Sequence, residues 1–248
     1  MKKEKDTLIV GLHPILEAIR AGKEINKVLI RKGLKNESFN ILFQQIRDFK
    51  IPFQHVPVEK LNRITKANHQ GVVAFLSVIE YQNIENILQN CFEQGRDPFI
   101  IILDHLTDVR NFGAIARTAE CAGVDAIIIP SNGSVSVSSD SVKTSAGALN
   151  HIPVCRSENL NITVKLLQNS GLAIMAATEN AADVYFATDL KGPIALVMGS
   201  EESGINSSIL KTAEKLIKIP LQGEVKSLNV SVACGIIVYE ILRQRMNS

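Results

Sequence analysis

An amide, a glycine and an arginine occur within seven residues near the middle of the chain, as Asn111, Gly113 and Arg117. A strand predicted to end at Leu103 precedes them, and the following helix is expected to start near Asn111, whose side chain could cap it. A glycine in a first helical turn costs about 1 kcal/mol relative to alanine, so Gly113 indicates that something large packs against the backbone. Arg117 lies on an otherwise alanine-rich helix and either points into solvent or contacts a ligand.

A second segment, Val197–Gly204, places two carboxylates in a turn between two glycines. A buried strand runs into Gly199, and the carboxyl ends of strands are where open α/β sheets bind ligands. The adjacent residues Glu201 and Glu202 stand at a strand end, where charged side chains rarely belong to a core. Either glutamate can be a solvated turn residue or part of a ligand site.

The third segment, 219–233, contains a strand end, a loop with a glycine, and the start of a long helix. Ser227 or Asn229 can cap this helix. From Val230 onward the helix is apolar on nearly all sides, and such a helix is expected to be buried.

These segments are positioned by a periodic α/β pattern that fills residues 98–248. Its apolar runs are continuous rather than alternating, which is typical of strands covered on both faces of a parallel sheet. The runs predict strands over 99–103, 126–129, 172–176, 194–198 and 216–219. Helices are predicted over 113–122, 141–148, 162–168, 207–213 and 229–245.

A smaller α/β unit precedes this pattern. Strands are predicted over 8–10, 28–30, 53–56 and 72–79, and helices over 13–21, 39–49 and 59–67. The polar stretch 79–97 ends in a Gly-Arg-Asp-Pro sequence and is interpreted as a linker with a short helix near 84–92. The sequence therefore predicts a first domain over 1–78, a linker over 79–97 and a second domain over 98–248.

Charge is divided unevenly between these parts. Residues 1–78 carry 14 basic and 7 acidic residues, a net charge of +7, whereas residues 79–248 carry 13 and 18, a net charge of −5. A basic first third indicates contact with a polyanion, because lysine and arginine supply most of the non-specific affinity for nucleic acids. A solvated basic face without a partner is the alternative interpretation.

Several classes of protein are disfavoured by what the sequence lacks. No apolar run approaches the ~18 residues that span a bilayer, and the start of the chain lacks the apolar stretch of a secretory signal. Four scattered cysteines without a C-x-x-C pair predict a reducing, cytoplasmic environment and core positions for all four. Metal-ligand clusters, dinucleotide-binding glycine patterns, P-loops and nucleophile elbows are not found.

Together the three segments resemble the motifs of the SPOUT-class RNA 2′-O-methyltransferases, the SpoU or TrmH family. The pattern N-x-G-x-x-x-R lies over 111–117, G-x-E-x-x-G over 199–204, and S-L-N-V-S-V-A over 227–233. The similarity covers residues 98–245. The first domain resembles the RNA-binding extension of the family, with G-x-H-P-x-x-E-A over 11–18 and His-Gln-Gly over 69–71.

The resemblance implies an α/β fold with a parallel sheet, helices on both faces and a C-terminal trefoil knot, preceded by a small L30e-like RNA-binding domain. S-adenosyl-L-methionine would lie in the knot, held largely by backbone groups of Gly199, Ile219 and Leu228. Two subunits would pair as a homodimer, largely through the final helix, with sites near the interface. The chemistry requires no metal.

The resemblance further implies 2′-O-methylation of a guanosine ribose in large-subunit (23S) ribosomal RNA. Arginine rarely gives up a proton, so we expect Arg117 to hold the adjacent phosphate and stabilise alkoxide charge. Glu201 and Asn229 would orient the ribose and the motif loops, and Ser227 would hydrogen-bond within the site. Asn111 would hold the turn of its motif or contact the ribose.

Three alternatives are open. The same reaction could act on transfer RNA, because the motifs define the chemistry and not the substrate. A second alternative is an RNA-binding or ribosome-assembly factor without catalysis, against which the joint presence of Arg117, Glu201, Ser227 and Asn229 argues. A nucleotide-dependent metabolic enzyme is the third, and it lacks a phosphate-binding fingerprint.

Overall fold

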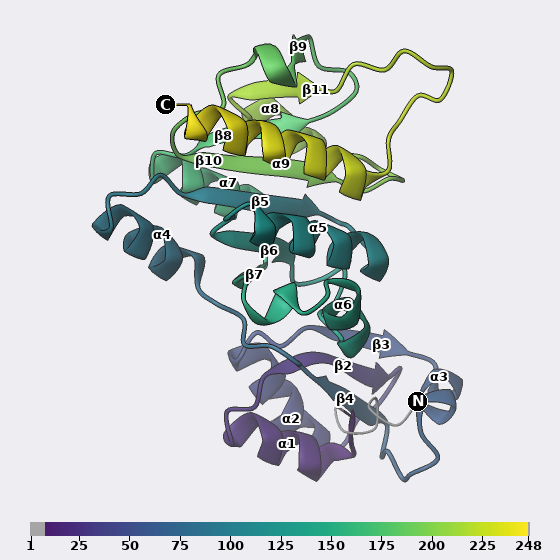
Figure 1. The fold of residues 1–248 in the computed structure, drawn as a ribbon. Helices are drawn as coiled ribbons and strands as arrows, with labels where there is room; N and C mark the ends of the chain where they lie inside the picture. The colour runs from purple at the N-terminus through teal and green to yellow at the C-terminus, as the bar shows by residue number, and fades with distance from the viewer. Residues whose placement is uncertain (1–7, 248) are drawn as a thin grey trace. The chain divides into compact units, whose positions relative to one another are not determined.

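A computed structural model describes residues 8–247 and divides them into two compact units (Figure 1). Unit 1 comprises residues 8–80 together with Ser136–Ser139. Unit 2 comprises Tyr81–Val135 and residues 140–247, and it contains all three motif segments. No helix in the described range 8–247 combines the length and apolarity needed to cross a membrane.

Unit 1 is built on a four-stranded mixed sheet with the strand order β1-β4-β2-β3. Strand β4 pairs antiparallel with β1 and β2, whereas β2 and β3 are parallel. The strands are β1 (Leu8–Val10), β2 (Ile25–Arg31), β3 (Phe53–Val56) and β4 (Val72–Leu76). The helices are α1 (Leu12–Arg20), α2 (Glu37–Asp48) and α3 (Val58–Ile64).

The two faces of this sheet are covered unequally. Helices α1 and α2 pack on one face through a large apolar core that includes Ile15, Leu42 and Val28. On the other face the core is small, and α3 contributes one fully buried residue, Leu61, which packs with Leu29 and its neighbours. The α3 face therefore leaves polar and charged side chains of the sheet near the surface.

Unit 2 contains a seven-stranded parallel sheet with the strand order β7-β6-β5-β10-β8-β11-β9. Because all strands are parallel, their carboxyl ends share one edge of the sheet. Every residue of the central strand β5 is buried. The strands are β5 (Phe99–Asp104), β6 (Ala126–Pro130), β7 (Val154–Ser157), β8 (Ala173–Ala177), β9 (Asp183–Val184), β10 (Ile194–Gly199) and β11 (Lys215–Lys218).

Helices cover both faces of this sheet, which confirms the predicted architecture. Helices α4 (Ile84–Glu93), α7 (Leu160–Asn169) and α8 (Ser207–Thr212) share one apolar core with the sheet. Figure 1 shows α5 (Val109–Cys121) and α9 (Val230–Met246) side by side on the opposite face. Shorter elements are α6 (Ser139–Thr144), η2 (Ala148–Asn150) and η3 (Tyr185–Ala187).

The five strands predicted for residues 98–248 are present, each bound within one residue of the prediction. The sequence does not predict β7 or β9, which are the two edge strands of the sheet. An edge strand has one neighbour and is short here, so it lacks the long apolar run that marks a central strand. The trefoil knot and the L30e-like fold of the first domain stay predictions.

The start of α5 differs from the expectation that Asn111 caps it. The helix begins at Val109, and Asp108 Oδ1 accepts hydrogen bonds from the backbone N–H groups of Arg110 and Asn111 at 2.7 and 2.8 Å. Asp108 is therefore the cap, because an aspartate in that position satisfies the free N–H groups of the first turn. The side chain of Asn111 is left available for other contacts.

Two further expectations can be compared with the structure. The segment 79–97, interpreted as a linker with a short helix near 84–92, contains that helix as α4, and its Leu88 and Cys91 are buried. The interpretation of Cys121 as a core residue is wrong, because that side chain is exposed on the last turn of α5. The other cysteines are buried, and burial raises the pKa of the Cys155 and Cys234 thiols to about 12.

Candidate active site

Side chains from the three motif segments meet at the carboxyl edge of the unit 2 sheet. Glu201 Oε1 accepts hydrogen bonds from Asn111 Nδ2 at 3.1 Å and from Asn229 Nδ2 at 2.9 Å. Asn229 Nδ2 also donates to Asn111 Oδ1 at 2.9 Å. Asn111 and Asn229 are 118 positions apart in the sequence, so only the fold brings them together. We call these three residues the motif junction.

Asn229 has two functions in this arrangement. Its Oδ1 caps α9 by accepting from the backbone N–H groups of Ser231 and Val232, at 3.0 and 3.4 Å. Its Nδ2 donates to both other members of the motif junction. The start of α9 is thereby tied to the motif junction through a single side chain.

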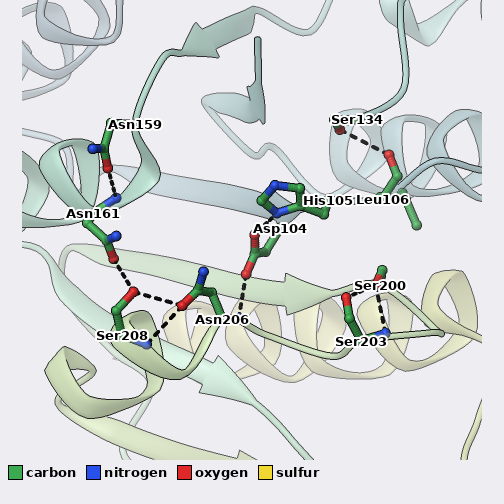
Figure 2. Close-up of polar contacts among 10 residues, drawn as sticks. All are labelled: Asp104, His105, Leu106, Ser134, Asn159, Asn161, Ser200, Ser203, Asn206 and Ser208. Atoms are coloured by element: carbon green, nitrogen blue, oxygen red, sulfur yellow. Dashed lines mark hydrogen bonds and ion pairs between the residues drawn. The ribbon is translucent and has the colours of Figure 1, made fainter. Parts of the chain in front are cut away.

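Glu201 is presented by a tight turn over residues 199–206, which we call the glycine loop. A Cβ atom on Gly199 would lie 2.2 Å from the carbonyl carbon of Gly204, so no larger residue fits there. Within the loop, Gly204 N–H donates to Ser200 O at 2.9 Å. The Ser200 and Ser203 hydroxyl groups are 2.7 Å apart (Figure 2). The loop is thus held by its own backbone and serines.

Beside the glycine loop lies a cavity of about 410 Å³, which is within the range of small-molecule sites. It is bounded by the carboxyl ends of β8, β10 and β11, by the glycine loop, by the segment after β11 and by the start of α9. Five of the predicted site residues line it, namely Gly199, Glu201, Ile219, Ser227 and Leu228. We call this cavity the edge pocket.

The edge pocket combines apolar walls with an acidic rim. Leu210, Ile217 and Ile237 supply apolar surface, and Glu179 and Glu202 join Glu201 in lining it. Lys218 also lines the pocket, so the three glutamates leave a net negative charge, which suits a ligand with an apolar part and a cationic part. No cluster of three or more potential metal-ligating side chains occurs among residues 8–247.

Sequence reasoning missed the part of the lining that follows β8. Thr178, Glu179 and Asn180 come directly after that strand and line the edge pocket. Their position depends on β8 lying between β10 and β11 in the sheet. The predicted strand over 172–176 marks where the chain leaves the sheet, but the lateral order of strands has no local sequence signal.

Arg117 is not brought into the edge pocket of its own chain. It lies on α5, where its side chain is exposed, and it does not line the pocket. Within residues 8–247 its guanidinium group has no hydrogen-bond or ion-pair partner. The group is therefore available to an anion or to another chain.

Gly113 is explained by packing against the protein itself. A Cβ atom at this position would lie 2.6 Å from Thr144 Cβ and 3.0 Å from the backbone nitrogen of Ser145. The expected close neighbour of the α5 backbone is thus the end of α6. The glycine sets how closely α5 and the α6 segment approach each other.

The fold and site together define an α/β protein whose pocket lies beside a junction of three separate motifs. Residues 98–239 match the SpoU rRNA Methylase family, and residues 8–82 match the family described as RNA 2′-O ribose methyltransferase substrate binding. A Staphylococcus epidermidis protein assigned to the TrmH family of tRNA/rRNA methyltransferases is 39% identical over 241 residues, 97% of each chain. The chain belongs to the SpoU/TrmH family of RNA methyltransferases.

Solved structures share this fold. The AdoMet-bound rRNA methyltransferase from Sinorhizobium meliloti matches with a TM-score of 0.59 and 24% identity, over 98% of this chain and 90% of that one. The TrmH/SpoU tRNA modifying enzyme of A. aeolicus matches with a TM-score of 0.57 and 29% identity, over 66% of this chain and 84% of that one.

Proposed function

We propose that the protein transfers a methyl group from S-adenosyl-L-methionine to the 2′-hydroxyl of a guanosine ribose in 23S ribosomal RNA. The motif junction carries this proposal, because Asn111, Glu201 and Asn229 converge beside the edge pocket at hydrogen-bond distances of 2.9–3.1 Å. A protein that only binds RNA would not need residues from three distant segments to meet beside a small-molecule pocket.

The edge pocket fits the cofactor by shape and by charge. Leu210, Ile217 and Ile237 offer an apolar surface for an adenine ring, and the glutamates of the rim complement a sulfonium cation. The missing side chain of Gly199 lets the backbone of the glycine loop pack against the end of β10. We assign the backbone groups of Gly199, Ile219 and Leu228 to cofactor binding. The cofactor, when bound, supplies an electrophilic methyl group.

The residues of the site mainly position the reactants. Methyl transfer requires the acceptor oxygen, the methyl carbon and the sulfur to lie in line, which is a task of orientation. Glu201 and Asn229 hold the ribose and the motif loops in place, and Asn111 fixes the turn of its motif or contacts the ribose. Ser227 lines the edge pocket, and we assign its hydroxyl to a hydrogen bond with the bound reactants.

A homodimer would complete the site with Arg117. Val232, Tyr239 and Met246 recur every seven residues along α9, and they are 52%, 50% and 76% exposed. Side chains at this spacing form one apolar stripe, and a stripe of this kind marks an interface. Because α5 packs beside α9, pairing through this face would place Arg117 near the interface, where it can bind a phosphate and stabilise alkoxide charge.

Unit 1 is assigned to RNA binding, and its α3 face offers a phosphate site. Lys27 on β2 is partly buried, and its pKa is lowered first by burial and then by the nearby charge of Lys60 on α3. No carboxylate within residues 8–247 forms an ion pair with either lysine. Two cations held together without a counterion are stabilised by a bound phosphate group.

Ribosomal RNA is favoured over transfer RNA by the extent of the fold. The S. meliloti rRNA methyltransferase shares the fold over 98% of this chain, whereas the A. aeolicus tRNA-modifying enzyme covers 66%. The same chemistry on tRNA is therefore the second candidate. A catalytically silent, rRNA-binding assembly factor is disfavoured, because the motif junction is complete.

Radiolabelled methyl transfer to bulk RNA tests the reaction, and mapping of methylated riboses in rRNA from a deletion strain tests the substrate. We expect label in 23S rRNA and loss of one ribose methylation in the deletion strain. Label only in tRNA would replace the substrate, and no label in any RNA would refute the activity.

Variants of Arg117 test its assigned function. Arg117→Ala should lose methyl transfer while cofactor affinity stays unchanged, and Arg117→Lys should recover part of the rate because it keeps the charge without the bidentate fork. Unchanged turnover in Arg117→Ala would contradict the assignment.

A further inference from the structure

A buried carboxylate stands at the end of β5, next to the glycine loop. Asp104 is 1% exposed, and in the parallel register of β5 and β10 it lies opposite Gly199. Its Oδ2 accepts a hydrogen bond from the backbone N–H of Asn206 at 2.6 Å, and its Oδ1 is 2.5 Å from His105 Nδ1 (Figure 2). Both carboxylate oxygens are therefore engaged.

We propose that Asp104 is a positioning residue that fixes the glycine loop in the shape needed for cofactor binding. The inference rests on the proposed function, which places the cofactor in the edge pocket. Asp104 does not line the pocket, so it acts through the loop and not by touching the ligand.

Both ends of the glycine loop are attached to this one residue. Gly199, where the loop begins, is the strand partner of Asp104, and Asn206, where the loop ends, donates its N–H to the Asp104 carboxylate. Between these ends lie Ser200–Ile205, all of which line the edge pocket. The position of Asn206 thus determines how the loop closes over Gly199.

Asn206 also transmits the attachment to α8. Its Oδ1 caps α8 by accepting from the Ser208 N–H at 3.0 Å, and it accepts from the Ser208 hydroxyl at 2.8 Å (Figure 2). The side chain of Asn206 therefore caps α8, whereas its backbone N–H donates to the Asp104 carboxylate. These two functions can be separated by substitution.

His105 supports the carboxylate from the side away from the pocket. A Cβ atom on Gly133 would lie 3.2 Å from the His105 ring, and Gly133 follows β6, on the opposite side of β5 from β10. The contact of 2.5 Å between His105 Nδ1 and Asp104 Oδ1 gives the carboxylate its second polar partner. His105 is about half exposed and contributes one of the two contacts of Asp104.

A pair of substitutions at position 206 isolates the backbone contact. The φ angle of Asn206 is −54°, close to the value that proline requires, so Asn206→Pro removes the N–H without opposing the backbone angle. Asn206→Ala is the matched control, because both variants lose the side-chain cap and only the proline variant loses the N–H. A hydrogen bond to a buried charged group is worth about 10- to 100-fold in an equilibrium constant.

Calorimetric titration with S-adenosylmethionine should show Asn206→Pro binding at least ~10-fold more weakly than Asn206→Ala. Hydrogen exchange without cofactor should show faster exchange over residues 199–205 in the proline variant only. Equal affinities and equal exchange in the two variants would overturn the proposal.

Variants of Asp104 provide a second test that does not involve proline. Asp104→Asn keeps an oxygen that can accept from Asn206, so it should bind the cofactor nearly as well as the unmodified protein. Asp104→Ala, which removes the acceptor of the Asn206 N–H, should bind ~10-fold or more weakly. Wild-type affinity in Asp104→Ala would overturn the proposal. If the unmodified protein itself fails to bind S-adenosylmethionine, the proposed function fails first.

Discussion

The motif junction can be tested by three substitutions of Asn229 that separate its two functions. Asn229→Ser keeps an oxygen that can cap α9 but cannot reach Asn111 and Glu201. Asn229→Asp also keeps the cap, but it replaces the donor Nδ2 with a second carboxylate oxygen facing Glu201. Asn229→Ala removes both the cap and the junction contacts.

The size of each effect follows from the contacts. Loss of an N-cap costs about 1 kcal/mol, so Asn229→Ala should be that much less stable than Asn229→Ser. In Asn229→Asp, the new carboxylate would lie 2.9 Å from that of Glu201, the length of the hydrogen bond it replaces. The two negative charges would repel each other by about 1.4 kcal/mol in water. For a domain of this size the repulsion corresponds to a Tm about 3–6 °C below that of Asn229→Ser.

Thermal unfolding followed by circular dichroism at pH 7 and at pH ~4 measures these differences. Protonating either carboxylate removes the repulsion, so the gap between Asn229→Asp and Asn229→Ser should shrink as the pH falls. Methyl transfer should be lost in all three variants, since each breaks the junction. Equal Tm values for the serine and aspartate variants at pH 7, with normal activity, would refute the contact between Asn229 and Glu201.

Three further results are expected. Gly199→Ala should lose cofactor binding, because its Cβ would lie 2.2 Å from the loop backbone. Gly223→Ala, where a Cβ meets nothing within 4 Å, should bind the cofactor normally. Titration calorimetry compares the two variants, and normal binding by both would contradict the close approach of the loop backbone to Gly199. The double variant Lys27→Gln/Lys60→Gln should lower the slope of log affinity for RNA against log salt concentration by about 1–2. The control, Arg20→Gln on α1 with Arg47→Gln on α2, should not lower it as much. Equal slopes in the two double variants would exclude the α3 face as a phosphate site. A thiol reagent at pH 8 should label only the exposed Cys121 in the native protein, because burial raises the pKa of the other three thiols. Rapid labelling of two or more cysteines would contradict the burial of those three.

The elements that the sequence predicts well are those whose own residues are buried on all sides. β5 and β10 are continuous apolar runs, so their bounds could be placed within one residue. β9 has two residues and lies at the sheet edge, and nothing in its composition distinguishes it from a loop. The start of α5 differs from the prediction because Asp108 and Asn111 are both good caps, and only the structure decides between them.

The site was predictable where a motif fixes both the residue type and the spacing. Asn111, Glu201 and Asn229 could be selected in this way, and the structure brings them together. Asp104 could not, because a single aspartate after a strand looks like an ordinary turn residue. The contact of Asp104 with the glycine loop depends on β5 and β10 being neighbours, which brings the Asn206 N–H within hydrogen-bond distance of the carboxylate. Contacts between neighbouring strands that are distant in sequence are not encoded in any local pattern.

The position of α4 affects how the catalytic half could be produced alone. The match to the methyltransferase family begins at residue 98, which makes that residue an obvious place to start a fragment. Leu88 of α4, with Ile84 and Ile87, packs into the same apolar core as β5, β8 and α7. A fragment starting at 98 would expose that core to water and invite aggregation, whereas one starting at Tyr81 would retain the helix and its cover.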